Sequence, residues 1–236
     1  MNAKEIIEIL EAQADPANVA GMRRFAITAE KAFGVPAPAL KQLAKDAKKQ
    51  TADRHRLALE LWLTGVHEAR IIAALIDDPK RVTEDQMEAW AADFDNWAVC
   101  DSTCGHLFSR TPLAYRKVEE WSARDAEFVK RAGIVLVAWL AVHDKKAPDA
   151  QIAEFLPLLE KHAGDDRNFI KKAVNWSLRS IGKRSLELNR LAIEAAARIR
   201  AQNTRSARWI AADALRELTG EKVQERLQSR LSASRK

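Results

Sequence analysis

The sequence predicts an all-α protein. Apolar residues recur every three to four positions almost throughout, as in Ile6, Ile7 and Leu10 or in Leu57 and Leu61, and this is the period of one face of an α-helix. No stretch keeps the two-residue alternation that is typical of a half-buried strand. Glycines and X-Pro dipeptides interrupt the pattern at short intervals, so the helices are expected to be short.

The breaks divide the chain into segments that leave room for about a dozen short helices. In order, they are Asp15-Pro16, Gly34-Val35-Pro36, Gly65, Asp78-Pro79, Thr111-Pro112, Ala147-Pro148, Gly164-Asp165, Gly182 and Gly220. Two segments also carry helix-start signals, Thr83 and the pair Asp165-Asp166, because short oxygen-bearing side chains accept hydrogen bonds from free backbone amides.

The connections are brief and no interior linker is present, which favours helices stacked as antiparallel pairs. We therefore expect a single solenoid domain over residues 1–228, with a compact orthogonal bundle as the alternative. The segment 229–236 has no apolar anchor after Leu231. It is predicted to be a disordered tail.

Composition excludes several classes of protein. The 236 residues are 47% hydrophobic and 31% charged, which is enough for a sizeable core. No apolar run reaches the roughly 20 residues of a membrane span, and the first residues lack a signal sequence, so a cytoplasmic protein is expected.

Cys100 and Cys104 are predicted to be reduced thiols, and with His106 they fall short of a zinc site. The scattered glycines form no phosphate-binding loop. We expect no metal, no nucleotide and no other cofactor.

Positive charge is concentrated near the end of the chain. Residues 167–236 contain 17 Lys and Arg and 6 Asp and Glu, a net charge of +11, whereas residues 1–166 carry −5. Such a local excess is expected of a phosphate-binding region. A solvated helix face rich in arginine is the alternative.

One short segment combines an indole with a carboxylate. Trp97 and Asp101 lie four residues apart in a helical pattern, so both side chains leave the same face of one helix. That pair suits a cation. Taken alone, such a carboxylate more often forms a structural salt bridge, for which Arg131 is a candidate partner. Arg131 could equally hold a phosphate.

A second segment combines an indole with positive charge. Lys172, Trp176, Arg179 and Lys183 follow the i, i+4, i+7, i+11 spacing of one helix face, and this basic stripe suits an anionic polymer. The other tryptophans lie among apolar residues and are predicted to pack in the core. They are Trp62, Trp90, Trp121, Trp139 and Trp209.

Several blocks of sequence occur in a characteristic order over nearly the whole chain. They are Phe33-Gly34-Val35-x-x-Pro38-x-Leu40-Lys41, Leu61-Trp62, Glu68-Ala69-Arg70, Trp97-x-x-x-Asp101, Lys130-Arg131 and Phe169-Ile170-Lys171-Lys172-Ala173-Val174-Asn175-Trp176-Ser177-Leu178-Arg179. In this order they resemble the AlkD-type DNA alkylation repair glycosylases, a family of HEAT-like helical repeats. The resemblance implies a HEAT-like solenoid with a concave basic face.

The resemblance also implies roles for individual residues. Asp101 corresponds to the catalytic carboxylate of the family, and Trp97 and Trp176 correspond to the indoles that flank the deoxyribose of the damaged nucleotide. Arg131 and Arg179 match positions that hold the DNA backbone. From the basic stripe, Lys172 and Lys183 are predicted to join them as DNA-binding residues.

Members of this family excise N3- and N7-alkylpurines without a metal or an organic cofactor. We therefore expect a monomeric DNA glycosylase that acts on alkylated purines in duplex DNA. One alternative is a non-catalytic helical-repeat protein that binds branched or distorted DNA, and another is a solenoid that binds an acidic protein. The chain departs from its relatives at Pro36 and Ala37, where they often carry polar side chains, and at Ala98, where many carry a larger or acidic residue.

Overall fold

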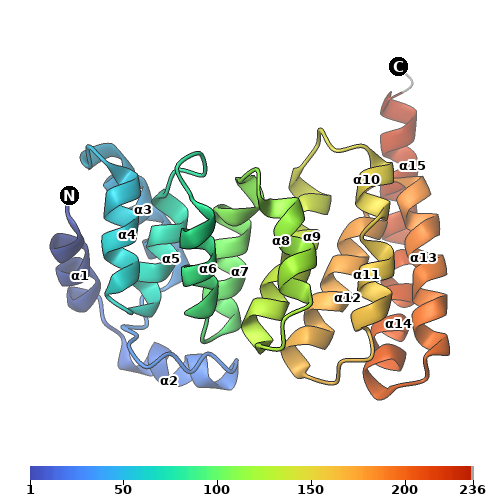
Figure 1. The fold of residues 1–236 in the computed structure, drawn as a ribbon, viewed down its shortest axis with the longest axis horizontal. Helices are drawn as coiled ribbons and strands as arrows, with labels where there is room; N and C mark the ends of the chain where they lie inside the picture. The colour runs from blue at the N-terminus through green and yellow to red at the C-terminus, as the bar shows by residue number, and fades with distance from the viewer. Residues whose placement is uncertain (235–236) are drawn as a thin grey trace. The chain divides into compact units, whose positions relative to one another are not determined.

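A computed structural model describes residues 1–234, and these residues form helices and loops with no strand among them (Figure 1). The all-α prediction is confirmed. The chain divides into two compact units, the first unit Met1–Ala114 and the second unit from Tyr115 onward. None of the helices within residues 1–234 is both long and apolar enough to cross a membrane.

The first unit has two layers of helices. Its elements are α1 (Ala3–Ala12), α2 (Pro16–Arg24), α3 (Ala37–Gln50), α4 (Arg54–Leu63), α5 (His67–Ile76), α6 (Glu84–Ala92), α7 (Trp97–His106) and the 3-10 helix η1 (Phe108–Arg110). Helix α5 packs against α3, α4 and α7. Helices α4 and α6 meet through Trp62 and Trp90, whose ring planes are 5° apart at a centroid distance of 3.9 Å. One layer therefore holds α3, α5 and α7, and the other holds α4 and α6.

A buried carboxylate fixes the entry to α3. Glu68 of α5 is 1% exposed and accepts hydrogen bonds from the backbone amides of Phe33 and Gly34, the latter at 2.6 Å. Gly34 has φ +79°, and a Cβ on it would lie 2.4 Å from the carbonyl oxygen of Asp15. Only glycine fits this turn. Two of the sequence blocks, around Gly34 and Glu68, therefore serve the same structural contact.

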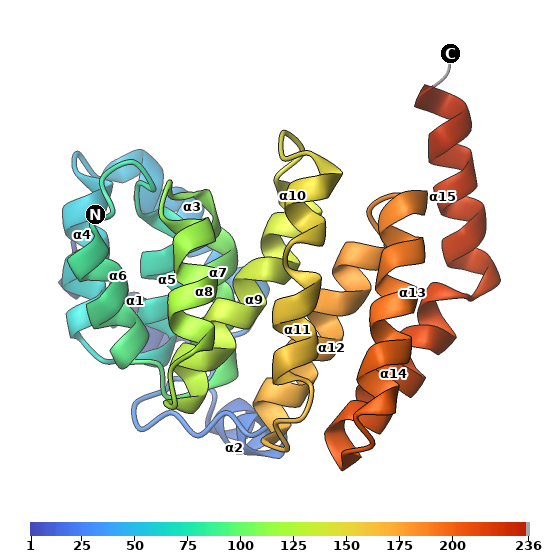
Figure 2. The same ribbon diagram turned by 45° about the vertical axis from the view of Figure 1, so that its right-hand side comes forward.

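The second unit is built around α12. Its elements are α8 (Ala114–Ser122), which begins at the boundary, α9 (Glu127–His143), α10 (Asp149–Ala153), α11 (Leu156–His162), α12 (Asn168–Gly182), α13 (Leu186–Ala201), α14 (Arg205–Leu218) and α15 (Glu221–Ser234). Helix α12 packs against α9, α11, α13 and α14. Helices α9, α12 and α14 form one layer, and α11 and α13 form the other (Figure 2).

Helix α15 extends beyond the predicted end of the domain. It lies against α13 and α14 (Figure 2), and Leu227 is buried at 2% exposure. The side-chain amide of Gln224 donates to the carbonyl of Leu218 at 2.6 Å and to Asn189 Oδ1 at 3.0 Å. The backbone is helical to Ser234, where the sequence predicts a disordered tail from Ser229. The rest of that predicted tail, residues 235–236, lies outside the described residues.

Most tryptophans pack where the period of the sequence places them. Trp62, Trp90 and Trp121 are buried, and Trp139 is partly buried. The prediction for Trp209 is wrong: it is 41% exposed, and the Lys171 ammonium lies 5.1 Å from its ring centroid. A cation over an indole face replaces the expected apolar contact.

Candidate nucleic-acid interface

Helix α7 begins with the predicted pair of indole and carboxylate. The Asn96 side chain caps the helix by accepting hydrogen bonds from the amides of Ala98 and Val99 at 3.0 and 3.1 Å. Trp97 is therefore the first helical residue, and Asp101 follows one turn later on the same face. Both side chains are partly buried. The structure brings these two predicted residues together on one helix.

The Trp97 indole is held by a contact from outside its own helix. Its Nε1–H donates to the carbonyl oxygen of Phe25 at 2.8 Å. Phe25 follows the last residue of α2 and is itself 69% exposed. Because this hydrogen bond links positions 72 residues apart, no local pattern in the sequence predicts it. It fixes the rotamer of the indole beside Asp101.

A cavity of about 550 Å³ opens next to α7 in the first unit. Apolar side chains from α2, α3 and α5 line most of it, with Phe25 at its edge. Pro36, Ala37 and Ala98, the three positions where the sequence departs from its relatives, all line this cavity. All three departures therefore change the lining of the same cavity beside α7.

Helix α12 carries the predicted basic stripe on one face. Lys172, Trp176 and Arg179 lie within the helix, and Lys183 is its C-cap residue. Lys172 is exposed, whereas Trp176 and Arg179 are partly buried. The structure therefore brings all four predicted residues together in the second unit.

Two of these cations are already paired with a carboxylate from α14. Glu217 accepts from Arg179 Nη1 at 2.5 Å and from Lys183 Nζ at 2.6 Å. Asp213 lies 3.7 Å from Arg179 Nη1. Burial alone would raise the pKa of Glu217, but the hydrogen bonds from Lys183 and Arg179 outweigh it and hold that pKa below its ordinary value. Glu217 is therefore charged at neutral pH, and it reduces the net charge of the stripe.

Arg131 of α9 is buried rather than displayed. It is 6% exposed, and its Nη1 donates to the carbonyl oxygen of Phe169 at 2.6 Å. Phe169 lies in the first turn of α12, so this hydrogen bond connects α9 to the start of the basic helix. Sequence reasoning gives no sign of this burial, because the contact crosses 38 residues.

The sequence analysis missed three further cations near Trp176. A cavity of about 280 Å³ in the second unit is lined by Trp176 and, among others, by Lys145, Arg226 and Arg230. Arg226 and Arg230 are four residues apart, which is a local signal for one helix face. The sequence predicts a disordered tail from Ser229, and that tail includes Arg230.

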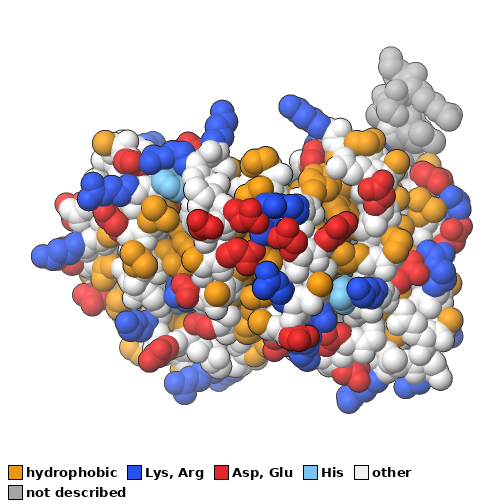
Figure 3. Space-filling model, viewed as in Figure 1, with side chains coloured by type: hydrophobic (Ala, Val, Ile, Leu, Met, Phe, Trp, Pro, Cys, Tyr) orange, Lys and Arg blue, Asp and Glu red, His pale blue; other side chains and the backbone are white. Residues whose placement is uncertain are grey.

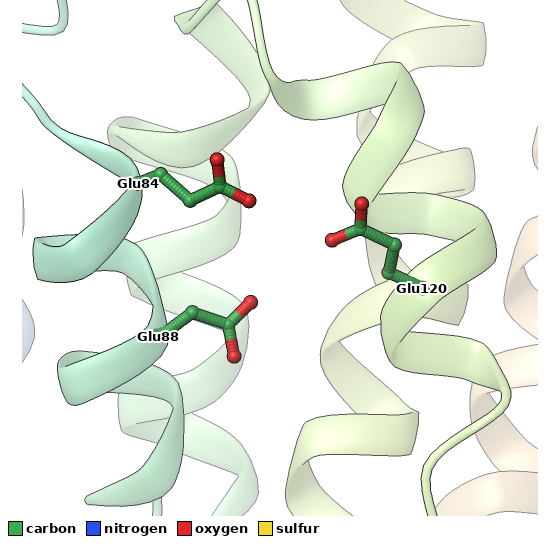
Figure 4. A group of neighbouring side chains, drawn as sticks. All are labelled: Glu84, Glu88 and Glu120. Atoms are coloured by element: carbon green, nitrogen blue, oxygen red, sulfur yellow. The ribbon is translucent and has the colours of Figure 1, made fainter.

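The helices outside the α7 and α12 layers carry acidic or mixed charge. Glu84 and Glu88 leave the same side of α6, one turn apart (Figure 4). In the second unit, Glu120 of α8 accepts from Lys117 Nζ at 2.5 Å. On the face of α11 and α13 in Figure 3, acidic and basic side chains are intermixed. These surfaces suit a polyanion less well than the stripe on α12 does.

The two cysteines lie inside α7. Cys100 and Cys104 are buried and form no disulfide, which agrees with the predicted reduced thiols. Both side chains are buried, so they pack in the core on the helix that carries Trp97 and Asp101.

Comparison with known proteins gives the chain a family. Among solved structures it is similar, at 23% identity and a TM-score of 0.75, to a protein of a family related to the HEAT-like repeat DNA glycosylases and described as having affinity for branched DNA structures. The match covers 93% of this chain and 97% of that one, and it confirms the predicted HEAT-like repeat fold. No curated protein matches the chain. The family model for DNA alkylation repair enzymes matches residues 6–218, and the chain therefore belongs to the DNA alkylation repair enzyme family.

Proposed function

We propose that the chain is a DNA glycosylase that excises cationic N3- and N7-alkylpurines from duplex DNA. The observation that carries this proposal is the α7 pair, in which Asp101 follows Trp97 by one turn and the indole is locked by its hydrogen bond to Phe25. Membership of the DNA alkylation repair enzyme family supports it.

The chemistry that this pair can support is the stabilisation of a positively charged sugar. Alkylation at N3 or N7 makes the purine cationic, so the glycosidic electron pair leaves with the base and neutralises it. The deoxyribose then carries the positive charge until water adds at C1′ and releases a proton. A carboxylate about 4 Å away contributes on the order of 4 kcal/mol at an effective dielectric constant near 20. Each desolvated indole face adds roughly 1–2 kcal/mol.

These contributions together are worth some four to six decades of rate as an upper estimate. In the proposal Asp101 faces the sugar and also orients the attacking water, and Trp97 and Trp176 flank the sugar. No general acid is required, because the leaving base is already cationic. A neutral adduct would be a poor substrate for the same reason.

The basic stripe supplies the DNA-binding surface in this proposal. Lys172, Arg179 and Lys183 contact backbone phosphates, as predicted from their spacing. Arg131 is 6% exposed, so we assign it the role of positioning the start of α12 through its bond to Phe169.

The test replaces the carboxylate by its isosteric amide. Asp101→Asn is expected to lower the single-turnover rate of 7-methylguanine release from methylated duplex DNA about 10³-fold, because roughly 4 kcal/mol of charge stabilisation is lost. Binding to undamaged duplex should change little. The matched control is Asp85→Asn, which removes one exposed carboxylate from α6. Unchanged release in the Asp101 variant would remove this residue from the mechanism.

The second candidate is a non-catalytic protein that binds branched DNA. It is favoured by the structural relative described as having affinity for branched DNA structures. A wild-type chain that releases no free base, yet binds a four-way junction more tightly than a linear duplex, would establish this function in place of the first.

A further inference from the structure

The cavity beside Trp176 has a distinctive lining. It lies where the ends of α9 and α12 meet α15, and its volume of about 280 Å³ is just below the range for ligand pockets, about 300–1,000 Å³. Five cationic residues line it together with the indole, and among the described residues no carboxylate does. The cationic residues are Lys145, Lys183, Arg184, Arg226 and Arg230.

Two of the five cations are already used by the fold. Arg184 donates to Asp149 at 3.0 Å and to backbone carbonyls of the last turn of α9 and of the loop after it, and its side chain is 10% exposed. Lys183 donates to Glu217 at 2.6 Å. These two residues therefore build the wall of the cavity, and their charges are largely compensated.

The other three cations are exposed. Within residues 1–234, no carboxylate pairs with the side chain of Lys145, Arg226 or Arg230. Arg226 and Arg230 each donate one long hydrogen bond, at 3.4 and 3.3 Å, to the carbonyl oxygen of Lys183. A guanidinium has five N–H donors, so most of the donors of both arginines remain available.

Interaction with the end of a helix explains only part of this arrangement. Two guanidinium groups near the last carbonyl of α12 are favoured by the helix dipole. That contact alone needs neither Lys145, which comes from the loop after α9, nor the cavity between them. Three positive charges without a carboxylate around one hollow make it attractive to an anion.

Helix α15 places the two arginines side by side. They lie at i and i+4, on one face of the helix. The opposite contacts of the helix are made by buried Leu227 and by Gln224, which donates to Leu218 and Asn189. Packing therefore sets the places on the helix from which the two arginines extend.

We propose that Arg226, Arg230 and Lys145 form a phosphate-binding site that α15 adds to the DNA interface. Guanidinium groups bind phosphate oxygens in bidentate fashion, and a sugar or base of the same nucleotide can lie on the Trp176 ring. The occupant is the backbone phosphate of the nucleotide whose sugar contacts Trp176. Helix α15 begins at Glu221, after the last residue matched by the family model, 218.

The inference rests on the proposed function, since it takes DNA as the ligand. The test compares two double variants of the full chain in binding a fluorescein-labelled undamaged duplex over a range of salt concentrations. Arg226→Gln/Arg230→Gln is expected to reduce the slope of log Kd against log salt by about one, the value for one lost phosphate contact. The affinity at 100 mM salt should fall about tenfold.

The control is Lys161→Gln/Arg200→Gln, which removes the same charge from exposed positions on α11 and α13. It should leave the slope unchanged. An equal fall in both double variants would overturn the site, because net charge alone would then explain the loss. If Arg226→Gln/Arg230→Gln lowers the melting temperature, Arg226→Lys/Arg230→Lys is used instead. The lysine variant keeps the charge but loses the bidentate geometry, so it should still bind DNA more weakly than the wild type. Wild-type affinity in this variant would also overturn the phosphate site.

Failure of the inference and failure of the proposed function give different results. In one outcome, the wild-type chain excises no base, and the salt slope falls only in Arg226→Gln/Arg230→Gln. This outcome supports the phosphate site and overturns the glycosylase proposal. Normal excision with identical slopes in the wild type and Arg226→Gln/Arg230→Gln overturns the site alone.

Discussion

At the scale of single residues, Glu217 controls how much of the basic stripe is available to a phosphate. It accepts hydrogen bonds from both Arg179 and Lys183, and Asp213 adds a second, more distant carboxylate to Arg179. A phosphate that approaches these cations must compete with the carboxylate. The sequence shows the cations at regular spacing, but the paired carboxylate lies 34 residues away from the nearer of them.

Glu217→Gln is therefore expected to strengthen DNA binding. Removing the carboxylate leaves Lys183 without an ion pair and Arg179 with only Asp213, at 3.7 Å. The slope of log Kd against log salt should therefore become steeper by about one, with Kd lower several-fold at 100 mM salt. Fluorescence anisotropy with an undamaged duplex measures both quantities. The control Glu187→Gln removes a carboxylate that is paired with Arg190 on α13. Equal tightening by both variants would show that net charge, rather than this pairing, limits affinity.

His162 makes the stability of the second unit depend on pH. Burial lowers its pKa, and Lys130 and Lys161 lower it further, to about 4 from an ordinary 6.5. The unfolded chain therefore takes up a proton on His162 below about pH 6.5, whereas the folded chain resists protonation until about pH 4. The stability that comes from neutral His162 is complete above pH 6.5, and it decreases as the pH falls from 6.5 toward 4.

Replacement of His162 is expected to remove part of that pH dependence. After allowance for partial solvent screening, protonation costs on the order of 1 kcal/mol at pH 5. The drop in melting temperature between pH 7 and pH 5 should therefore be about 2–4 °C smaller in His162→Gln than in the wild type. Differential scanning calorimetry measures this. Identical drops in the two proteins would contradict the assigned pKa.

At the scale of helices, α8 and α9 approach each other closely at a glycine. A Cβ built on Gly133 of α9 would lie 2.5 Å from the amide nitrogen of Ser122 and 3.0 Å from backbone atoms of Trp121 and Val118. The contact is with backbone, which cannot rotate away. The absent side chain therefore sets the distance between the two helices.

Gly133→Ala is expected to destabilise the protein by about 1–3 kcal/mol or more, because the helices must separate. The melting temperature should fall by roughly 2–4 °C for each kcal/mol. The matched control is Gly21→Ala in α2, where a Cβ would meet no atom within 4 Å. This second substitution should be neutral or stabilising by about 0.5–1 kcal/mol. The same destabilisation by both would contradict the close approach.

The helix-start signals show how far local patterns reach at this scale. Thr83 caps α6 by accepting from the Gln86 amide, as predicted. The second signal correctly predicts a helix that begins at Asn168, but the expected cap is wrong, because α12 has no side-chain cap. Asp165 instead accepts from the amide and side chain of Arg167, and Asp166 accepts from the amide of Ser206 in α14. The two carboxylates serve a turn and a neighbouring helix, and only the packed structure creates the second partner.

At the scale of the whole molecule, the charge of the chain is divided unevenly between its parts. The net charge of +11 lies in residues 167–236, which belong to the second unit, and much of it is paired there, as Arg198 is with Glu160. Around Trp176, the described residues leave the cations of Lys172, Lys145, Arg226 and Arg230 without a carboxylate partner. The usable part of the positive charge is therefore smaller and more localised than the composition implies.

The sequence by itself determined the helical class, the period of the core and the two candidate helix faces. Trp97 with Asp101, and Lys172 with Trp176 and Arg179, each lie within a few helical turns. Their placement follows from 3.6 residues per turn and needs no other part of the chain. The ordered sequence blocks also indicated the repair-enzyme family.

Only the tertiary structure decided which charges remain available and which side chains are fixed. Four contacts join residues that are tens of positions apart in the sequence. Arg179 pairs with Glu217, Arg131 is buried against Phe169, Trp97 donates to Phe25, and α15 lines the same cavity as Trp176. Helical periodicity is a short-range property of the backbone, whereas charge compensation and burial depend on which helices pack together. Local patterns therefore identify the candidate helix faces, and packing determines their chemistry.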